Sequence, residues 1–319
     1  MQKKILILRL SSFGDIILTF PLLNLLMGEG DFIIDYAVKS EYSSLVKSHP
    51  AVKNILEYDG DNLKILKKKI KSENYDYIID LHDNLRTIYL KSFQNSKVLT
   101  FRKDSLKKII LVLFKINLLR NSPPVYLKYL RTIKKIIKNY TEDFSISDLH
   151  TESYLNIQKH FILLAPSSKH FTKTYPKEKY FQYIKSNPQK FFILTGSNNA
   201  TDMNICSYLG ELPNTFNLAG KTNFGELIYL VRKSEFVICN DSGILHLAES
   251  LGKKVFVTFG STVKEFGFFP QLKSTKVFEI TDLKCRPCSH LGRDKCPREH
   301  FKCMNEITLI TDITDENIS

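Results

Sequence analysis

The sequence predicts two α/β domains, each built on a parallel β-sheet with helices on both faces. Short apolar runs alternate with mixed or amphipathic stretches along most of the chain, and each run is continuously apolar, which is typical of parallel strands buried on both faces. A polar patch at 141–153 interrupts this pattern, which then restarts. We therefore expect an N-terminal domain at 1–150 and a C-terminal domain at 151–319.

The apolar runs themselves are predicted to be the strands. We expect those of the first domain at 4–10, 32–38, 54–58, 77–81 and 97–101, and those of the second at 161–165, 191–195, 215–218, 236–239, 254–259 and 276–280. Open parallel sheets bind ligands outside the carboxyl ends of their strands. The residues that follow each run are therefore the candidates for a functional site.

Composition excludes several classes of protein. The chain has 319 residues, of which 43% are hydrophobic and 25% charged, so it is too apolar to be disordered. No apolar run approaches the roughly 20 residues of a transmembrane helix. The first apolar run is too short for a secretory signal, and Arg9 interrupts it. We therefore expect a cytoplasmic protein, and six cysteines do not suggest a secreted disulfide scaffold.

The net charge of +13 is concentrated in one segment. Residues 84–140 hold 14 Lys or Arg and a single acid, Asp104, whereas the rest of the chain has 32 basic and 32 acidic residues. A nucleic-acid-binding protein is disfavoured, because the excess is confined to one segment, tryptophan is absent and no recognised binding motif occurs. We expect no nucleic-acid partner.

The first candidate site follows the first predicted strand. Residues 9–15 read RLSSFGD, and a helical pattern begins there. Asp15 falls at or near the helix N-terminus, where an acid is favoured as a cap or by the helix dipole. The same position at a strand end would also suit a carboxylate that acts as a general base. The local sequence leaves both interpretations open.

The second candidate site follows the first strand of the C-terminal domain, where residues 165–176 read APSSKHFTKTYP. Hydroxyls at Ser167 and Ser168, with a lysine such as Lys173, suit a phosphate group. A polar surface loop is the plainer alternative. No GxGxxG or Walker-type loop occurs, which argues against a dinucleotide dehydrogenase or a P-loop kinase.

The strongest local pattern is CNDSGILHLA at 239–248, at the end of another predicted strand. Asp241, Ser242 and Gly243 open a helix, and exposed amides at a helix N-terminus can bind an anion. His246 lies one turn after Ser242 and shares its helix face. The alternatives are an Asp/Ser cap with a core histidine, or a Ser-His hydrolase. We discount the hydrolase because no GxSxG is present.

Two further patterns could bind a metal, and neither is favoured. The DGD sequence at 59–61 is explained by a turn followed by a helix cap. Four cysteines cluster near the C-terminus, and the first pair has zinc-knuckle spacing, but the second pair is too irregular for us to favour structural zinc. These residues are Cys285, Cys288, Cys296 and Cys303, with His290 and His300 nearby.

Taken in order, these segments resemble glycosyltransferase family 9, the lipopolysaccharide heptosyltransferases. The resemblance is carried by 5–15, by NDSG and His246 at 240–246, and by FGST at 259–262, where the family usually has Gly-Pro-Thr. TKTYP at 172–176 is similar to the family's Thr-Lys-Arg-Trp-Pro segment, and DLHDNLR at 80–86 is similar to its Asp-Leu-His/Gln-Gly-x-Leu-Arg segment.

The resemblance implies a glycosyltransferase B fold, with two Rossmann-like domains facing a central cleft. It implies an acceptor-binding N-terminal domain, a nucleotide-sugar-binding C-terminal domain with a cysteine-rich tail, and inverting, metal-independent transfer of a sugar, most typically heptose from ADP-heptose. Asp15 would be the catalytic base. The donor would be held by Ser167, Ser168, Lys173, Asp241, Ser242, Gly243 and His246, and the acceptor by Ser11, Ser12, Gly14 and Arg86.

The implied partners are the nucleotide-sugar donor and a phosphorylated glycolipid of the lipopolysaccharide core, with no cofactor required. The implied location is the inner face of the cytoplasmic membrane, where the basic and apolar stretches 105–120 and 125–140 would rest on anionic lipid. The alternative is that their apolar side chains pack inward and their lysines are only solvated. One departure is GSNNA at 196–200, which lacks the glutamate of the family's Gly-Gly-x-x-Glu. A nucleotide-sugar epimerase or hydrolase on the same fold is the alternative.

Overall fold

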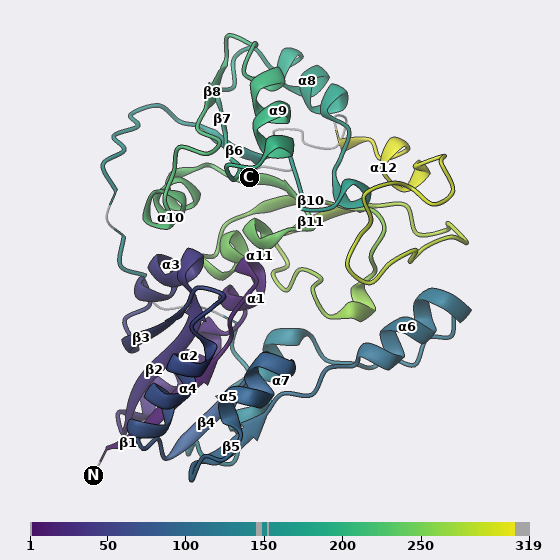
Figure 1. The fold of residues 1–319 in the computed structure, drawn as a ribbon. Coiled ribbons are helices and arrows are strands. Elements are labelled where there is room, and N and C mark those ends of the chain that lie inside the picture. Colours follow the sequence, from purple (N-terminus) through teal and green to yellow (C-terminus); the bar gives the residue numbers. More distant parts are fainter. Residues whose placement is uncertain (1, 145–148, 152, 310–319) are drawn as a thin grey trace. The chain divides into compact units, whose positions relative to one another are not determined.

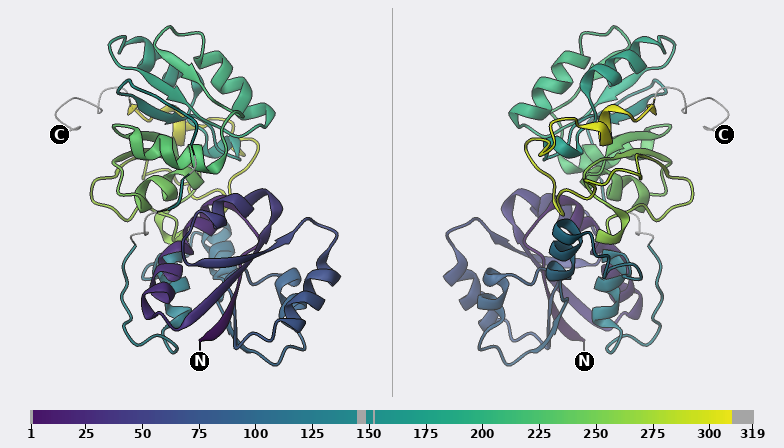
Figure 2. Two further views of the ribbon diagram at one scale, coloured as in Figure 1. Left: turned by 90° about the vertical axis from the view of Figure 1, so that its left-hand side faces the viewer. Right: turned by 90° about the vertical axis from the view of Figure 1, so that its right-hand side faces the viewer.

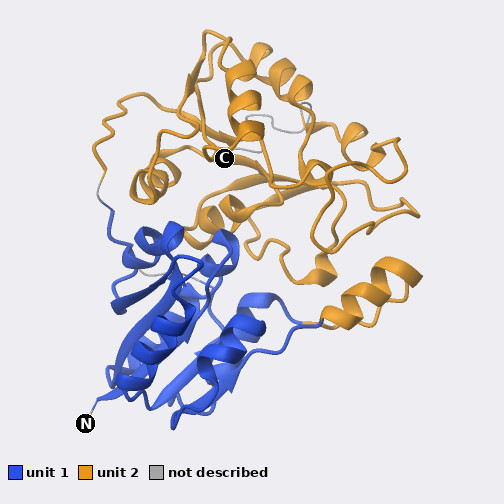
Figure 3. Ribbon diagram, in the orientation of Figure 1, with its two compact units in different colours: residues 1–104, 123–152 blue, residues 105–122, 153–319 orange. Residues whose placement is uncertain are grey.

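The computed structural model describes residues 2–144, 149–151 and 153–309. It divides into two compact units, which Figure 3 colours separately. Unit 1 comprises 1–104 and 123–152, and unit 2 comprises 105–122 and 153–319. Each unit contains one parallel sheet with helices on both sides (Figures 1 and 2). The predicted α/β class with two parallel sheets is therefore confirmed.

Unit 1 is built on a five-stranded sheet in the order β3-β2-β1-β4-β5. Every neighbouring pair of these strands is parallel. The strands are β1 (Lys3–Leu8), β2 (Phe32–Lys39), β3 (Val52–Tyr58), β4 (Tyr77–Asp80) and β5 (Lys97–Thr100). The order reverses at β1, so the loop after β1 lies at the position in the sheet where such folds place their ligands.

The helices of unit 1 cover the two faces of this sheet in pairs. Packing of α4 and α5 buries Leu66, Ile70 and Leu90 against Leu6, Leu8 and the side chains around them, and α2 packs against α7. The helices are α1 (Phe13–Ile17), α2 (Phe20–Glu29), α3 (Ser43–Lys47), α4 (Leu63–Ser72), α5 (Leu85–Lys91) and α7 (Val125–Ile133), with the 3₁₀ turn η1 (Ser40–Tyr42).

Unit 2 is built on a six-stranded sheet in the order β11-β10-β9-β6-β7-β8. All of its strand pairs are parallel as well. The strands are β6 (Ile162–Ala165), β7 (Phe192–Leu194), β8 (Thr215–Asn217), β9 (Val237–Asn240), β10 (Val255–Phe259) and β11 (Lys276–Glu279). Strands β6, β9 and β10 are adjacent, so the loops that follow them meet at one edge of the sheet.

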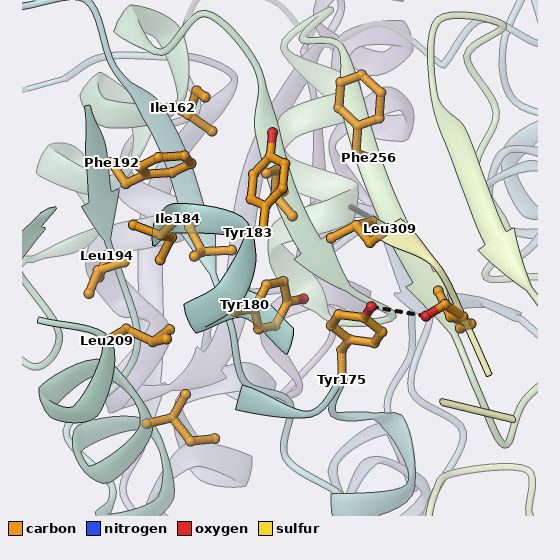
Figure 4. Close-up of a cluster of buried hydrophobic side chains, with 14 of the residues drawn as sticks. Ile162, Tyr175, Tyr180, Tyr183, Ile184, Phe192, Leu194, Leu209, Phe256 and Leu309 are labelled. Atoms are coloured by element: carbon orange, nitrogen blue, oxygen red, sulfur yellow. Dashed lines mark hydrogen bonds between the residues drawn. The ribbon is translucent and has the colours of Figure 1, made fainter. Parts of the chain in front are cut away.

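Large aromatic side chains pack among Ile and Leu in the core of unit 2 on one face of this sheet (Figure 4). Tyr180, Tyr183 and Phe192 are fully buried there, and the Tyr175 hydroxyl donates a hydrogen bond of 3.0 Å to the Ile307 carbonyl. The helices of this unit are α6 (Ser105–Phe114), α8 (Lys177–Lys185), α9 (Ala200–Leu209), α10 (Phe224–Lys233), α11 (Gly243–Ser250) and α12 (Lys302–Asn305), with the 3₁₀ turns η2 (Phe171–Lys173) and η3 (Lys264–Phe266).

The chain enters unit 2 once before residue 150, over residues 105–122. Leu111 and Leu119 of this excursion form a small buried cluster with Phe266. The Lys115 ammonium also donates to the backbone carbonyls of Cys285 and Pro287, at 3.2 Å and 2.6 Å. These contacts explain why α6 belongs to unit 2, although β5 before it and α7 after it both belong to unit 1.

All the predicted strands form, with ends within two residues of those expected. The DGD sequence is a turn: the Asp59 carboxylate accepts from the amides of Asp61 and Asn62, each at 3.0 Å, and Asn62 precedes α4. No helix among the described residues is both long enough and apolar enough to cross a membrane.

Candidate active site

The loop after β1 places Asp15 in the first turn of α1. Ser12 is the N-cap residue, and its hydroxyl donates a hydrogen bond of 2.7 Å to the Asp15 carboxylate, whose other oxygen faces Arg9. Ser11 and Gly14 lie half-buried on either side of Ser12. Asp15 therefore has the capping position expected from the sequence, and its side chain keeps 19% of its surface exposed.

Arg9 pairs with Asp15 at 2.8 Å, and its guanidinium also donates to the Leu81 carbonyl at 2.6 Å. Burial acts to lower the pKa of Arg9, but the charge of Asp15, with smaller effects from Tyr129 and Tyr36, outweighs it and raises that pKa. The ion pair favours the charged carboxylate, which is the form of Asp15 able to accept a proton. The sequence did not point to a role for Arg9, although Arg9 lies within the motif that contains Asp15.

The end of β4 supplies the neighbours of this pair. The imidazole of His82 accepts the Leu10 amide proton at 3.1 Å. Burial, with smaller effects from the charges of Arg9 and Lys103, lowers the pKa of His82 to about 3. His82 is consequently neutral at physiological pH, and Asp15 is the anionic group of this loop.

Asp80 organises the turn from which His82 projects. It is fully buried, accepts from the amides of His82 and Asp83 at 3.0 Å and 2.9 Å, and pairs with the Lys91 ammonium at 2.7 Å. Arg86, predicted to contact the acceptor, is exposed at the start of α5, with its guanidinium 5.7 Å from the Tyr58 ring centroid. The assignment of Arg86 to the acceptor stays a prediction.

In unit 2 the three loops that follow β6, β9 and β10 converge on one carboxylate. The Lys173 ammonium lies 2.7 Å from Asp241 Oδ2, and the Thr262 hydroxyl donates to the same oxygen at 2.6 Å. Asp241 is almost completely buried, whereas the Lys173 side chain keeps 15% of its surface exposed. The structure thus brings Lys173 and Asp241 together as predicted, and it adds Thr262, for which the sequence had indicated no role.

The Asn240 side chain connects these loops by hydrogen bonds. Its side-chain oxygen accepts from the Tyr175 amide at 2.9 Å and from the Thr258 and Tyr180 hydroxyls at 2.8 Å and 3.3 Å, while its amide nitrogen donates to the Ala165 carbonyl at 3.4 Å. Asn240 is fully buried. One side chain therefore joins the ends of β6, β9 and β10.

The substitution Asn240→Ala is expected to lower the free energy of unfolding by roughly 2–4 kcal/mol, because several buried donors lose their acceptor. Urea denaturation followed by circular dichroism measures this. Asn121→Ala, at an exposed turn, is the control, with an expected change within about 0.5 kcal/mol. Equal unfolding midpoints for wild type and Asn240→Ala would show that the loops are held by other contacts.

The other residues predicted to hold the sugar donor belong to the loop after β6 and to the start of α11. Ser167 and Ser168 are buried, and the Ser168 hydroxyl donates to the Asp241 carbonyl at 3.4 Å. Ser242 is the N-cap residue of α11, and Gly243 is its first residue. The first amides of a helix lack partners within the helix, so they favour a bound anion at this point.

His246 lies one turn into the same helix. It is 4% exposed, with its ring centroid 6.0 Å from that of Phe268. The packing of His246 fits the alternative of a core histidine. Its place in the first turn of α11 is also compatible with a contact to the sugar donor, so a role in donor binding stays a prediction.

The four cysteines of the C-terminal region line one pocket, together with Thr172, Ser261 and His300 among other residues. None is in a disulfide, and the sulfur of Cys285 lies 3.8 Å from His300 Nε2. Burial raises the pKa of the Cys303 thiol to about 12, with smaller contributions from the other three thiols. We call Cys285, Cys288, Cys296 and Cys303 the four-cysteine cluster.

Comparison with known proteins identifies the family. A sequence profile of glycosyltransferase family 9 (heptosyltransferase) matches residues 64–296, most of the chain. The chain belongs to glycosyltransferase family 9. Among curated relatives, this family 9 chain is 26% identical to lipopolysaccharide heptosyltransferase 1 of Campylobacter coli over 289 residues, which cover 81% of this chain and 84% of that protein.

Solved structures confirm the fold of this family 9 glycosyltransferase. ADP-heptose lipopolysaccharide heptosyltransferase II of E. coli has a TM-score of 0.71 at 17% identity, over 96% of this chain and 98% of that one. E. coli heptosyltransferase WaaC with ADP has a TM-score of 0.69 at 14% identity, over 86% and 92%. The predicted family, the glycosyltransferase B fold and the enzyme class are therefore correct.

Proposed function

We propose that this enzyme transfers a heptose from ADP-heptose to a phosphorylated glycolipid of the lipopolysaccharide core, with inversion at the anomeric carbon. The relatives named above support both substrates, because two are named for lipopolysaccharide heptosyl transfer and one was solved with ADP. The observation that carries the proposal is the Lys173–Asp241 pair at the N-terminus of α11. It places a cation and the first helix amides at one edge of the unit 2 sheet.

In the proposed reaction an acceptor hydroxyl attacks the anomeric carbon of the donor while the bond from that carbon to the diphosphate breaks. Asp15 takes the proton of the attacking hydroxyl, and ADP leaves with the bonding electron pair. Arg9 orients the Asp15 carboxylate and keeps it charged between turnovers.

Charge that develops on the leaving diphosphate would be stabilised by groups of unit 2. The Lys173 ammonium and the amides at the start of α11 are held in place before the reaction, so they can favour the transition state over the ground state. Asp241 pairs with the ammonium, the Thr262 hydroxyl donates to Asp241, and Asp241 also offers a carboxylate oxygen to sugar hydroxyls. Because the Lys173 ammonium and the α11 amides supply positive charge at the leaving diphosphate, we propose that transfer does not depend on a metal ion.

A panel of nucleotide sugars tests the donor. ADP-heptose is expected to bind at least about tenfold more tightly than a UDP-hexose, which is about 1.4 kcal/mol of preference. Isothermal titration with the full chain measures the affinities, and product analysis with and without a core glycolipid separates transfer from hydrolysis or epimerisation. Turnover of the donor that is as fast without acceptor as with it would favour the epimerase or hydrolase alternative.

The basic excursion in unit 2 is proposed to contact the membrane in which the acceptor lies. Helix α6 exposes Leu106, Leu113 and Phe114 by 65–70% of their surface, with Lys107 between them in sequence. Lys108 instead lies 5.0 Å from the Phe268 ring centroid of the same unit. Exposed apolar side chains beside lysines suit the interface of an anionic bilayer.

The variant Lys107→Gln/Leu113→Gln/Phe114→Gln is therefore expected to bind vesicles of anionic phospholipid at least about tenfold more weakly, because each basic residue near such a surface contributes ~1 kcal/mol and apolar side chains add to it. Vesicle co-sedimentation measures the loss. Lys64→Gln/Ile65→Gln, on the exposed face of α4, is the matched control. Undiminished sedimentation of the α6 variant, with the donor affinity intact in both, would remove α6 from the proposed interface.

A further inference from the structure

Arg286 lies in the loop between β11 and α12, in the segment that holds the four-cysteine cluster, and its side chain keeps only 4% of its surface exposed. Its guanidinium donates to the Ile280 carbonyl at 2.8 Å and pairs with the Glu279 carboxylate. Nε and Nη2 both donate to the Thr262 carbonyl, at 3.0 Å and 2.8 Å. Because the guanidinium is a planar fork, three acceptors around it hold the side chain in one orientation.

Thr262, which receives two of these hydrogen bonds, belongs to the candidate donor site. It is buried, and its hydroxyl donates at 2.6 Å to Asp241 Oδ2, the oxygen that lies 2.7 Å from the Lys173 ammonium. Threonine is branched at Cβ and has few χ1 rotamers, so the direction of its hydroxyl follows from the position of its backbone. Arg286 holds that backbone, and the hydroxyl in turn holds the carboxylate that faces Lys173.

The backbone that carries Arg286 is itself anchored within unit 2. The Lys115 ammonium donates to the two carbonyls on either side of Arg286, those of Cys285 and Pro287, at 3.2 Å and 2.6 Å. The Cys288 amide donates to the Ser261 carbonyl at 3.3 Å. Arg286 therefore reaches the loop after β10 from a segment that has a fixed position.

Other contacts also join these loops. The Thr172 hydroxyl, beside Lys173, accepts from the Arg293 amide at 2.8 Å and donates to Ser261 at 3.0 Å. These bonds, together with those of Asn240, are independent of the Arg286 side chain. A substitution of Arg286 should therefore displace Thr262 without unfolding the loops around it.

We propose that Arg286 is a positioning residue for the donor site: by fixing the Thr262 backbone, it aims the Thr262 hydroxyl at Asp241 and so sets the position of the Lys173 ammonium. This role rests on the proposed function, in which Lys173 lies at the leaving diphosphate. A displaced cation lowers the rate because it stabilises the transition-state charge only in a preorganised geometry. A purely structural role would instead lower stability and leave kcat of the folded enzyme unchanged.

The test is a double-mutant cycle of Arg286→Lys and Thr262→Val in the full chain. Lysine keeps the charge but lacks the fork that reaches three acceptors, and valine keeps the shape of threonine without its hydroxyl. Each single variant is expected to lower kcat for heptose transfer about tenfold. The double variant should lie within about threefold of the slower single variant, because both substitutions act through the same hydroxyl. Arg298→Lys, exposed on the same loop, is the control and should stay within about twofold of wild type.

Losses that multiply to about 100-fold in the double variant would overturn the proposal, because Arg286 and Thr262 would then act independently. Equal kcat values for Arg286→Lys and Arg298→Lys would overturn it as well. Circular dichroism shows whether Arg286→Lys folds. If it does not, Lys115→Met replaces it in the cycle, with an expected loss of about threefold that disappears in the Thr262→Val background. The absence of that loss, or its persistence beside Thr262→Val, would then decide against the proposal.

The affinity for ADP separates failure of this proposal from failure of the proposed function. Isothermal titration of the same four proteins needs no sugar transfer, and Arg286→Lys is expected to weaken ADP binding about threefold in wild type but not in the Thr262→Val background. Inorganic pyrophosphate replaces ADP as the probe if the chain does not bind adenine nucleotides. A wild-type chain that binds either probe without transferring heptose refutes the proposed function alone, whereas multiplied losses of affinity refute the role of Arg286 alone.

Discussion

Asp15→Asn is expected to reduce kcat for sugar transfer by roughly 10²–10⁴-fold while the affinity for ADP changes little. The amide keeps the size of the side chain, and its one oxygen can accept from Arg9 while its NH₂ faces the Ser12 hydroxyl, but it cannot take the proton of the acceptor hydroxyl. ADP binding is assigned to unit 2, so a loss confined to kcat separates the proposed base from a role in donor binding. Single-turnover transfer and isothermal titration with ADP measure the two quantities.

Two controls lie at the same edge of the unit 1 sheet. Asp83→Asn removes a carboxylate from a left-handed position with φ of 50°, which Asn also tolerates. His82→Asn keeps an acceptor for the Leu10 amide but removes the imidazole. Both are expected to stay within about tenfold of wild-type kcat, because neither is assigned to the proton transfer. Transfer by Asp15→Asn at the rate of these controls would refute the assignment of Asp15 as the base.

The pH dependence provides a further criterion for the same assignment. Because burial lowers the pKa of His82 to about 3, His82 stays neutral from pH 5 to pH 9 and cannot produce an acid limb near pH 6. An acid limb near pH 6 that disappears in His82→Asn would therefore contradict the assignment of Asp15 as the base.

The fold could be predicted from the sequence to a large extent because its physical cause is local. Strands covered on both faces must be continuously apolar, and runs such as Ile5–Leu8 and Val255–Phe259 leave little ambiguity. The excursion of residues 105–122 into unit 2 was not predictable in this way. Its place depends on contacts of Leu111 and Leu119 with Phe266, about 150 residues away, and no periodicity records such a contact.

The candidate site shows the same division between local and distant causes. Asp15, Lys173 and Asp241 could be predicted because each follows a strand or opens a helix, and both signals are local in sequence. Their partners were missed because a residue that only donates to a carboxylate leaves no pattern in the sequence. Arg9 pairs with Asp15 within the same motif, and Thr262 donates to Asp241 from the loop after the next strand. Arg9 directly follows β1 and Thr262 lies in the loop after β10, and this position after a strand was the signal that could have identified them.

Lys173→Met is expected to lower kcat for transfer by roughly 10²–10³-fold and to weaken ADP binding as well, because the variant removes a preorganised cation from the leaving diphosphate. The variant also deprives Asp241, which is 5% exposed at its side chain, of its ion-pair partner, while the hydrogen bond from the Thr262 hydroxyl stays. Lys173→Met/Asp241→Asn removes both charges and should restore stability without restoring the rate.

Lys169→Met is the matched control for this prediction. Lys169 belongs to the same loop after β6, is exposed, and carries the same charge. If the lysines act only through a long-range electrostatic field, both substitutions should lower kcat equally, and both losses should shrink as salt is added. If Lys173 contacts the diphosphate directly, only Lys173→Met should lower kcat strongly, and the loss should persist at high ionic strength. Equal losses in both variants, or a Lys173→Met enzyme within about threefold of Lys169→Met, would show that the positive charge acts at a distance. A loss specific to Lys173 in both kcat and ADP affinity would instead assign it to the donor phosphates.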